Sequence, residues 1–268
     1  MKMSLCVSVF CCATSYSLMA QAVCTPAPDC AELGFTMDAS KCSGAALKCP
    51  WDLSKAACKE KEALKSQLPI LYGDGTVSQD IISGKTPIAI VFDEAAKLAV
   101  ALTDVKKDGT AGSEMMNWSC SYCDTSGLQN CTYSDISFDT SLTPITCGVD
   151  GRLNTNAILA STCNGTIYAA TATNNYQPAG CTKDFCKKSK WFLPSLSDLQ
   201  NIYLQKTQVN ASLTLLKDYR AAAVKNDYYW SSTESTYLYV WLFNMNDGYR
   251  NYLNKHNNYY YVRPVLAF

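Results

Sequence analysis

The most reactive side chains in this sequence are cysteines, and two of them have the spacing of a redox or metal site. Cys120 and Cys123 form a C-x-x-C sequence, which both disulfide oxidoreductases and thiolate metal sites use. No second C-x-x-C completes a four-thiolate zinc site, and no thioredoxin-like strand and helix pattern surrounds the pair. We therefore predict a structural role for these cysteines, with redox or metal chemistry as the alternative.

His256 is the only histidine of the chain. A single imidazole excludes a three-histidine zinc centre and an H-E-x-x-H metalloprotease. The residue lies among asparagines, with no evident acid and nucleophile to complete a catalytic triad. We predict no catalytic residue, no metal ligand and no cofactor, and we expect a protein that is not an enzyme.

A different group of side chains suits binding. The segment 244–261 combines asparagines, whose amides both donate and accept hydrogen bonds, with tyrosines, which offer rigid aromatic area at a low entropy cost. The alternative is ordinary turn chemistry with cross-strand tyrosine pairs. The residues predicted to face a ligand are Asn246, Tyr249, Asn251, Tyr252, Asn254, His256, Asn257 and Tyr260.

A basic cluster surrounds two further cysteines, Cys181 and Cys186. A loop braced by a disulfide at these positions would present ammonium groups to the sulfate or carboxylate groups of a polyanion. A solvated charged loop is the alternative. The residues predicted to contact a polyanion are Lys183, Lys187, Lys188 and Lys190.

Composition and the first residues indicate an exported protein. The 268-residue chain has 23 basic and 23 acidic residues, a balance that argues against nucleic-acid binding. Residues 1–22 combine Lys2, an apolar run and an A-x-A sequence at 20–22, which predicts a signal peptide. No later segment has 18 consecutive apolar residues, so we expect no membrane span after cleavage. We predict secretion or attachment to the cell surface, which for the bacterial family named below is the bacterial envelope.

Cleavage of the signal peptide would also remove Cys6, Cys11 and Cys12 from the 15 cysteines. The remaining even number favours up to six disulfides in an oxidising compartment. Residues 23–69 are dense in cysteine and turn residues and end in a charged stretch. We predict a small Cys-rich module with a connector helix there, followed by a larger domain over 70–268.

The larger domain has the element pattern of an α+β fold. Two apolar runs, 87–92 and 97–102, predict an antiparallel hairpin. A looped excursion pinned by disulfides is expected over 103–150. Ser195 and Asp198 have the spacing of a capping box. Helices are predicted from Asn154 or Thr155 to Ala160, after Ser195, and over 212–223, and strands over 228–233, 237–243 and 259–263.

Three motifs give this domain a family resemblance. They are WFLPS at 191–195, YWSSTE at 229–234 and VRPVLAF at 262–268, and their order and spacing are jointly specific. The sequence resembles, over about 70–268, a bacterial family of exported domains that includes the C-terminal domain of the Legionella collagen-like adhesin and the Fibrobacter major paralogous domains. The resemblance implies a C-type-lectin-like fold, with two helices packed on small twisted antiparallel sheets. Residues 23–59 lie outside it.

The resemblance also implies ligand display at the cell surface. In the adhesin, the related domain is associated with binding sulfated polysaccharide. We expect an extracellular glycan or protein ligand and no nucleic acid, and the sequence leaves a homo-oligomer open. The triplets of calcium-dependent sugar-binding lectins are absent, so no calcium is predicted. Within the family motifs, Glu234 and Arg263 are predicted to form a buried structural pair.

Three other functions remain as alternatives. The first is a structural subunit of a surface appendage or envelope layer. The second is a retroelement-diversified binding protein, because the segment 244–261 has a position similar to the variable region of such proteins. The third is an oxidase of the formylglycine-generating type, which has a related fold and uses a cysteine pair.

Overall fold

The computed structural model describes residues 67–122, 124–161 and 168–268. The chain divides into two units, and the described residues belong to the second, Gln67–Phe268. The predicted signal peptide, the Cys-rich module and almost all of the connector helix lie outside the described residues. Within the described ranges, no helix has the length and hydropathy needed to cross a membrane.

The first layer is an antiparallel sheet with the strand order β2-β1-β3-β4-β9-β5. The predicted hairpin forms its centre, where Ile90 lies opposite Val100. Its apolar residues are buried on both faces, which explains their continuous hydrophobic run. The strands are β1 (Ile70–Tyr72), β2 (Val77–Ser78), β3 (Pro87–Asp93), β4 (Leu98–Ala101), β5 (Trp191–Phe192) and β9 (Val265–Ala267).

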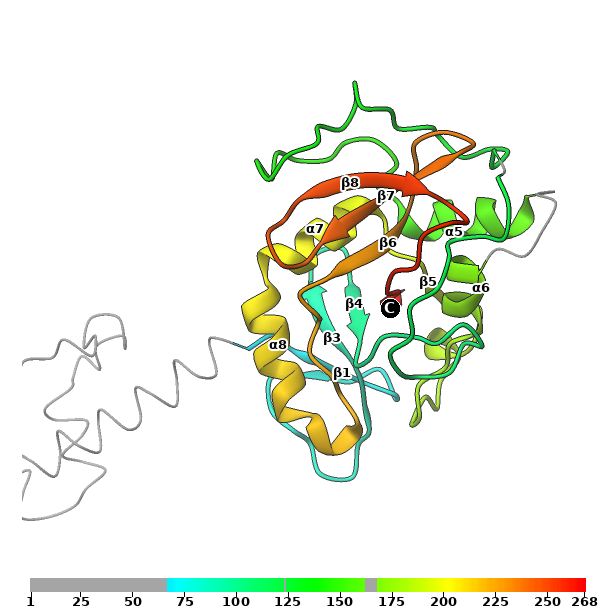
Figure 1. The fold of residues 1–268 in the computed structure, drawn as a ribbon. Helices are drawn as coiled ribbons and strands as arrows, with labels where there is room; N and C mark the ends of the chain where they lie inside the picture. Colours follow the sequence, from blue (N-terminus) through cyan, green and yellow to red (C-terminus); the bar gives the residue numbers. More distant parts are fainter. Residues whose placement is uncertain (1–66, 123, 162–167) are drawn as a thin grey trace, which may run out of the picture. The chain divides into compact units, whose positions relative to one another are not determined.

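The second layer is a three-stranded antiparallel sheet, β6-β7-β8 (Figure 1). Its strands are β6 (Tyr228–Glu234), β7 (Tyr239–Asn244) and β8 (Arg250–Asn254). A turn at 246–248 joins β7 to β8, and Gly248 adopts a positive φ of 81° there. The strand predicted at 259–263 is wrong. Tyr260 and Tyr261 form only isolated bridges, and β8 and β9 lie on either side of them.

In the described residues, four α-helices pack against the sheets, where the residue patterns predicted three and the resemblance implied two. They are α5 (Gly151–Ala160), α6 (Tyr168–Asn175), α7 (Leu196–Leu204) and α8 (Lys206–Leu215). The capping box is confirmed: Asp198 N–H donates to Ser195 Oγ, and Ser195 N–H donates to Asp198 Oδ2. Asp150 caps α5 instead of Asn154 or Thr155, because its side chain accepts a hydrogen bond from Leu153 N–H.

The predicted helix over 212–223 has the wrong limits. Helix α8 begins at Lys206, directly after α7, and a 3-10 turn at Lys217–Tyr219 follows it. The sequence places no breaker between α7 and α8, so their boundary depends on how each packs. The expected looped excursion is confirmed, since the described residues between β4 and α5 form no helix or strand, and a disulfide joins Cys131 to Cys147.

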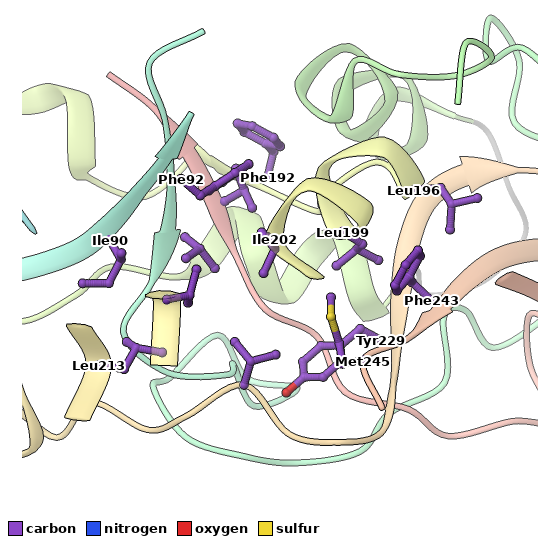
Figure 2. Close-up of a cluster of buried hydrophobic side chains, with 14 of the residues drawn as sticks. Ile90, Phe92, Phe192, Leu196, Leu199, Ile202, Leu213, Tyr229, Phe243 and Met245 are labelled. Carbon is purple, nitrogen blue, oxygen red and sulfur yellow. The ribbon is translucent and has the colours of Figure 1, made fainter. Parts of the chain in front are cut away.

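Helix α7 fills the space between the two sheets. Leu199 and Ile202 point from α7 into a cluster that also holds Ile90 of β3 and Phe243 of β7 (Figure 2). Apolar contacts on both sides therefore fix α7 and, through it, the position of β7. The fold is α+β, with antiparallel sheets and disulfides at Cys131–Cys147 and Cys181–Cys186.

Candidate functional site

The predicted ligand-facing residues do not form one surface. Side chains alternate between the faces of a strand, so residues along β8 are divided between two faces. Tyr252 lies opposite Trp241 on one face, whereas Asn251 lies opposite Leu242 on the other. Tyr260 belongs to the second face as well, where its ring lies 5.0 Å from Trp230 and 5.5 Å from Tyr228.

The two ends of the β7–β8 hairpin are also distinct. Asn246 and Tyr249 lie at the turn, where their backbone N–H groups donate to the side chains of Asn244 and Asp247. Asn254, His256 and Asn257 lie at the opposite end of β8, and His256 N–H donates to Asn254 Oδ1. Ordinary turn chemistry therefore explains the asparagine and aspartate residues at the turn end of the hairpin.

A continuous row of side chains does form on the face that carries Tyr252. Phe138 lies 4.6 Å from Tyr252 between ring centroids, and Tyr252 lies 5.3 Å from Tyr239. Tyr239 lies opposite Asn254 across the strands. Asn254 Nδ2 donates to the Tyr122 hydroxyl at 2.7 Å, and the Tyr122 ring meets His256 edge-on at 4.1 Å.

We name this row the aromatic strip and define it as Tyr122, Phe138, Tyr239, Tyr252, Asn254 and His256. Phe138 and Tyr122 are 39% and 42% exposed, and the other four are partly exposed, so the strip reaches solvent. Three of its members were among the predicted residues. The prediction missed Tyr122, Phe138 and Tyr239, because two of them come from a distant loop. For Tyr122 and Phe138, the sequence signal that could have indicated a binding surface is the presence of large aromatic residues in a polar, cysteine-bearing segment.

The loop that supplies Phe138 is held to the sheet at several points. Trp241 Nε1 donates to the Cys131 carbonyl at 2.6 Å, and Cys131 is bonded to Cys147. The Phe138 ring rests against the buried Trp241 at 5.3 Å. Since both ends of the loop are fixed by the disulfide, Phe138 is positioned by the fold and does not depend on a ligand to order it.

Arg250 fixes the same loop from the other side. Its guanidinium donates to Gln200 Oε1 of α7 at 2.8 Å and to Thr143 Oγ1 at 3.2 Å, and it also bonds the Thr143 carbonyl. The residue is fully buried, and burial lowers the pKa of Arg250 while Asp139 raises it. Arg250 is therefore a structural link between β8, α7 and the loop.

A buried ion pair lies at the end of β8, where Lys255 stands between the strip residues Asn254 and His256, and it corrects one prediction. Lys255 Nζ pairs with Glu234, and its ammonium lies 5.0 Å from the Trp118 ring. Glu234 Oε2 also accepts a hydrogen bond from Thr125 N–H at 3.2 Å. Burial lowers the pKa of Lys255, and the carboxylate of Asp124 raises it. Glu234 thus fastens the loop after Tyr122 to the end of β8.

Arg263 has a different partner from the one predicted. Its guanidinium lies 3.1 Å from Asp104 Oδ1 and also donates to the carbonyls of Ala101, Leu102 and Ala222. The Glu234–Arg263 pair is therefore replaced by Glu234–Lys255 and Arg263–Asp104. The family motifs predict buried charges at Glu234 and Arg263. The sequence contains several oppositely charged residues that could pair with each of them, and only the fold determines which one does.

The lysine cluster forms a separate exposed loop. Cys181 and Cys186 are disulfide-bonded, and Thr182 N–H donates to the Gly73 carbonyl at 3.0 Å. Lys187 pairs with Asp184 at 2.7 Å, which neutralises one of the four predicted charges. Lys183, Lys188 and Lys190 are exposed. We name residues 181–190 the lysine loop; it contacts Gly73, directly after β1, and Asn174 near the end of α6, and it lies outside the strip.

A pocket of about 390 Å³ lies where α5 and α7 begin. Its carboxylates, Asp150 and Asp198, cap these helices, and a Cβ at Gly151 would lie 2.7 Å from Asp198 Oδ2. Burial raises the pKa of Asp198 to about 6, against hydrogen bonds from Ser195. Capping accounts for these acids. In the part of the chain that the structure describes, no group of three or more histidine, cysteine or acidic side chains is arranged to hold a metal ion.

Comparison with known families agrees with the motifs. The family model of the Lcl C-terminal domain matches residues 116–266, which is more than half of the chain. The chain belongs to the Lcl C-terminal domain family. The match begins after β4, later than the resemblance over 70–268 suggested, and it includes the whole aromatic strip and the lysine loop. No curated protein matches the sequence at a significant level.

Among solved structures, the crystal structure of a fimbrial protein from Bacteroides ovatus is similar to this chain, with 16% sequence identity and a TM-score of 0.47. The similarity covers 75% of this chain and 48% of the fimbrial protein, so the chain spans about half of that protein's length. The likeness is too weak to carry an argument about function.

Proposed function

We propose that this chain is an exported, adhesin-like protein of the bacterial surface whose Lcl C-terminal domain binds a glycan through the aromatic strip. The observation that carries the proposal is the continuous row from Phe138 to His256 on one face of the three-stranded sheet. The proposed mechanism is recognition without catalysis. The prediction of export and the absence of an enzymatic role are part of this proposal.

The chemistry of the strip suits a sugar better than a purely apolar partner. Aromatic rings offer flat apolar faces on which the C–H faces of a pyranose ring stack, and the Asn254 amide and Tyr122 hydroxyl can exchange hydrogen bonds with sugar hydroxyls. The rings are already packed on Trp241 and on one another. A ligand would therefore bind without ordering these side chains, which reduces the entropic cost of binding.

The finer description of the fold belongs to the same proposal. We infer a C-type-lectin-like domain, supported by two small antiparallel sheets and by helices packed between and beside them. The first described strand, β1, and the last, β9, lie in one sheet. An experimental structure whose strand order superposes poorly on lectin-like domains would contradict this assignment, but it would leave the strip and its proposed ligand intact.

Glycan binding is tested with the full exported chain on an array of soluble microbial and plant polysaccharides, both uncharged and sulfated. The strongest binder is then titrated by calorimetry against Phe138→Ala and Tyr122→Ala. We expect each variant to lose at least about tenfold in affinity, which corresponds to about 1.4 kcal/mol. Both side chains are surface-exposed, so the fold should survive, and thermal melts check this.

Tyr219→Ala is the matched control, because Tyr219 is also an exposed aromatic residue, 37% accessible, and lies after α8 away from the strip. It should bind like the wild type. If no polysaccharide binds, or if the strip variants bind unchanged, the proposed function is wrong. Filaments or lattices that form without ligand and are unaffected by the strip variants would instead favour the structural-subunit alternative.

A further inference from the structure

We propose that the aromatic strip selects an uncharged polysaccharide and excludes sulfated or carboxylated ones. This inference rests on the proposed function and names the ligand class of the same site. The argument depends on which charges the strip-forming segments carry and on which of those charges reach the surface.

The segments that form the strip are unusually poor in cations. Between Lys107 and Arg152 the sequence contains no lysine or arginine, and this stretch supplies Tyr122 and Phe138. Between Lys225 and Arg263, which includes β6, β7 and β8, the only cations are Arg250 and Lys255. Neither segment therefore provides the clustered basic side chains with which proteins hold polyanions.

The two cations that these segments do contain are buried and occupied. Arg250 is bound by Gln200 and Thr143, and Lys255 pairs with the buried Glu234. Both have almost no solvent exposure. A sulfate group on a ligand lying along the strip could not reach either of them without disrupting the fold.

Acidic groups border the strip instead. Asp124 is exposed two residues after Tyr122, and Asp139 directly follows Phe138. Hydrogen bonds from Ser141 to the Asp139 carboxylate hold its pKa below the usual range, so it stays ionised at neutral pH. Charges within one Debye length, about 8 Å at physiological salt, still repel a bound anion. The strip thus offers stacking surface and hydrogen bonds next to two acidic residues and to no exposed cation of the same segments.

The test compares laminarin, dextran, mannan and xylan with a sulfated derivative of each, bound to the full exported chain. We expect at least one uncharged polymer to bind. Phe138→Ala should weaken this binding at least about tenfold, and the wild-type affinity should change less than about twofold between 50 and 500 mM NaCl. Sulfation of the same polymer should weaken strip-dependent binding by about tenfold or more. The double variant Asp124→Asn and Asp139→Asn should recover most of the lost affinity for the sulfated polymer. Its affinity for the uncharged polymer should stay within about twofold of the wild-type value. Asp218→Asn, at an exposed position after α8, is the control and should change neither affinity.

The outcomes separate the inference from the proposed function. If sulfated polymers bind more tightly than uncharged ones and Phe138→Ala abolishes this, the inference is overturned while glycan binding by the strip stands. If every polymer that binds does so only through the lysine loop, shown by loss of binding in the combined variant Lys183→Gln, Lys188→Gln and Lys190→Gln and by unchanged binding in Phe138→Ala, both statements about the strip are overturned. If no polymer binds, the proposed function and the inference fall together.

Discussion

The aromatic strip and the lysine loop both carry predicted binding residues, yet they are built in different ways. The strip collects side chains from residue 122 to residue 256, and its members are fixed by a buried ion pair, a buried arginine and a disulfide that spans 16 residues. The lysine loop takes all of its charges from ten consecutive residues. A disulfide of separation 5 closes it, and its ion pair is exposed.

This difference teaches that local clustering in the sequence is a poor guide to a preorganised surface. The lysine loop is conspicuous in the sequence because its charges are neighbours, but Lys183, Lys188 and Lys190 are exposed and carry their ammonium groups at the end of long, flexible side chains. The strip is inconspicuous in the sequence because the fold assembles it. Only the strip has the rigid support that makes stacking favourable without an ordering cost.

The ion pairs of the two regions give the largest expected contrast. Lys255→Met removes the partner of the fully buried Glu234, and an uncompensated buried charge costs about 3–5 kcal/mol of the free energy of unfolding. Lys187→Met removes the exposed partner of Asp184 and should cost less than about 1 kcal/mol. Urea unfolding of both variants measures the contrast. If both variants lose the same free energy of unfolding, the buried ion pair supports the strip no better than the exposed pair supports the lysine loop.

The disulfides give the next largest contrast. Replacement of Cys131 and Cys147 by alanine should cost about 3 kcal/mol and release Phe138, and replacement of Cys181 and Cys186 should cost about 2 kcal/mol, because the second loop is shorter. Only the first change should weaken glycan binding, by about tenfold or more. Retained affinity after the first change would show that the loop is not needed to position Phe138.

The smallest expected effect is a pH dependence of the free energy of unfolding that arises from Asp198 in helix α7. The folded-state pKa of Asp198, about 6, lies above the unfolded value, so the folded protein binds more protons between pH 4 and 6. The protonated Asp198 therefore contributes roughly 2 kcal/mol to the free energy of unfolding. This contribution is complete below pH 4 and is lost as the pH rises to about 6. Asp198→Asn keeps an acceptor for Ser195 N–H and should remove this slope, whereas Asp218→Asn should retain it. A slope that persists in Asp198→Asn would assign the pH dependence to another group.

The parts of the fold that sequence could predict are those fixed by local physics. The capping box of Ser195 and Asp198 and the apolar hairpin around Ile90 and Val100 are local patterns, and both are confirmed. The Glu234–Arg263 pair was wrong because pairing depends on tertiary geometry. The aromatic strip could be predicted only in part, because alternation along β8 separates Tyr252 from Asn251, and Phe138 comes from a loop more than a hundred residues earlier.

The most direct test of the central claim is to map a bound sugar by nuclear magnetic resonance. The isotope-labelled chain is titrated with an uncharged oligosaccharide taken from the polymer that binds best, and the amide and aromatic shifts are followed. The account predicts that the largest shifts occur at Tyr122, Phe138, Tyr252 and Asn254, with none at Lys183 or Lys188. Shifts centred on the lysine loop, or saturable binding that leaves the strip unperturbed, would contradict it.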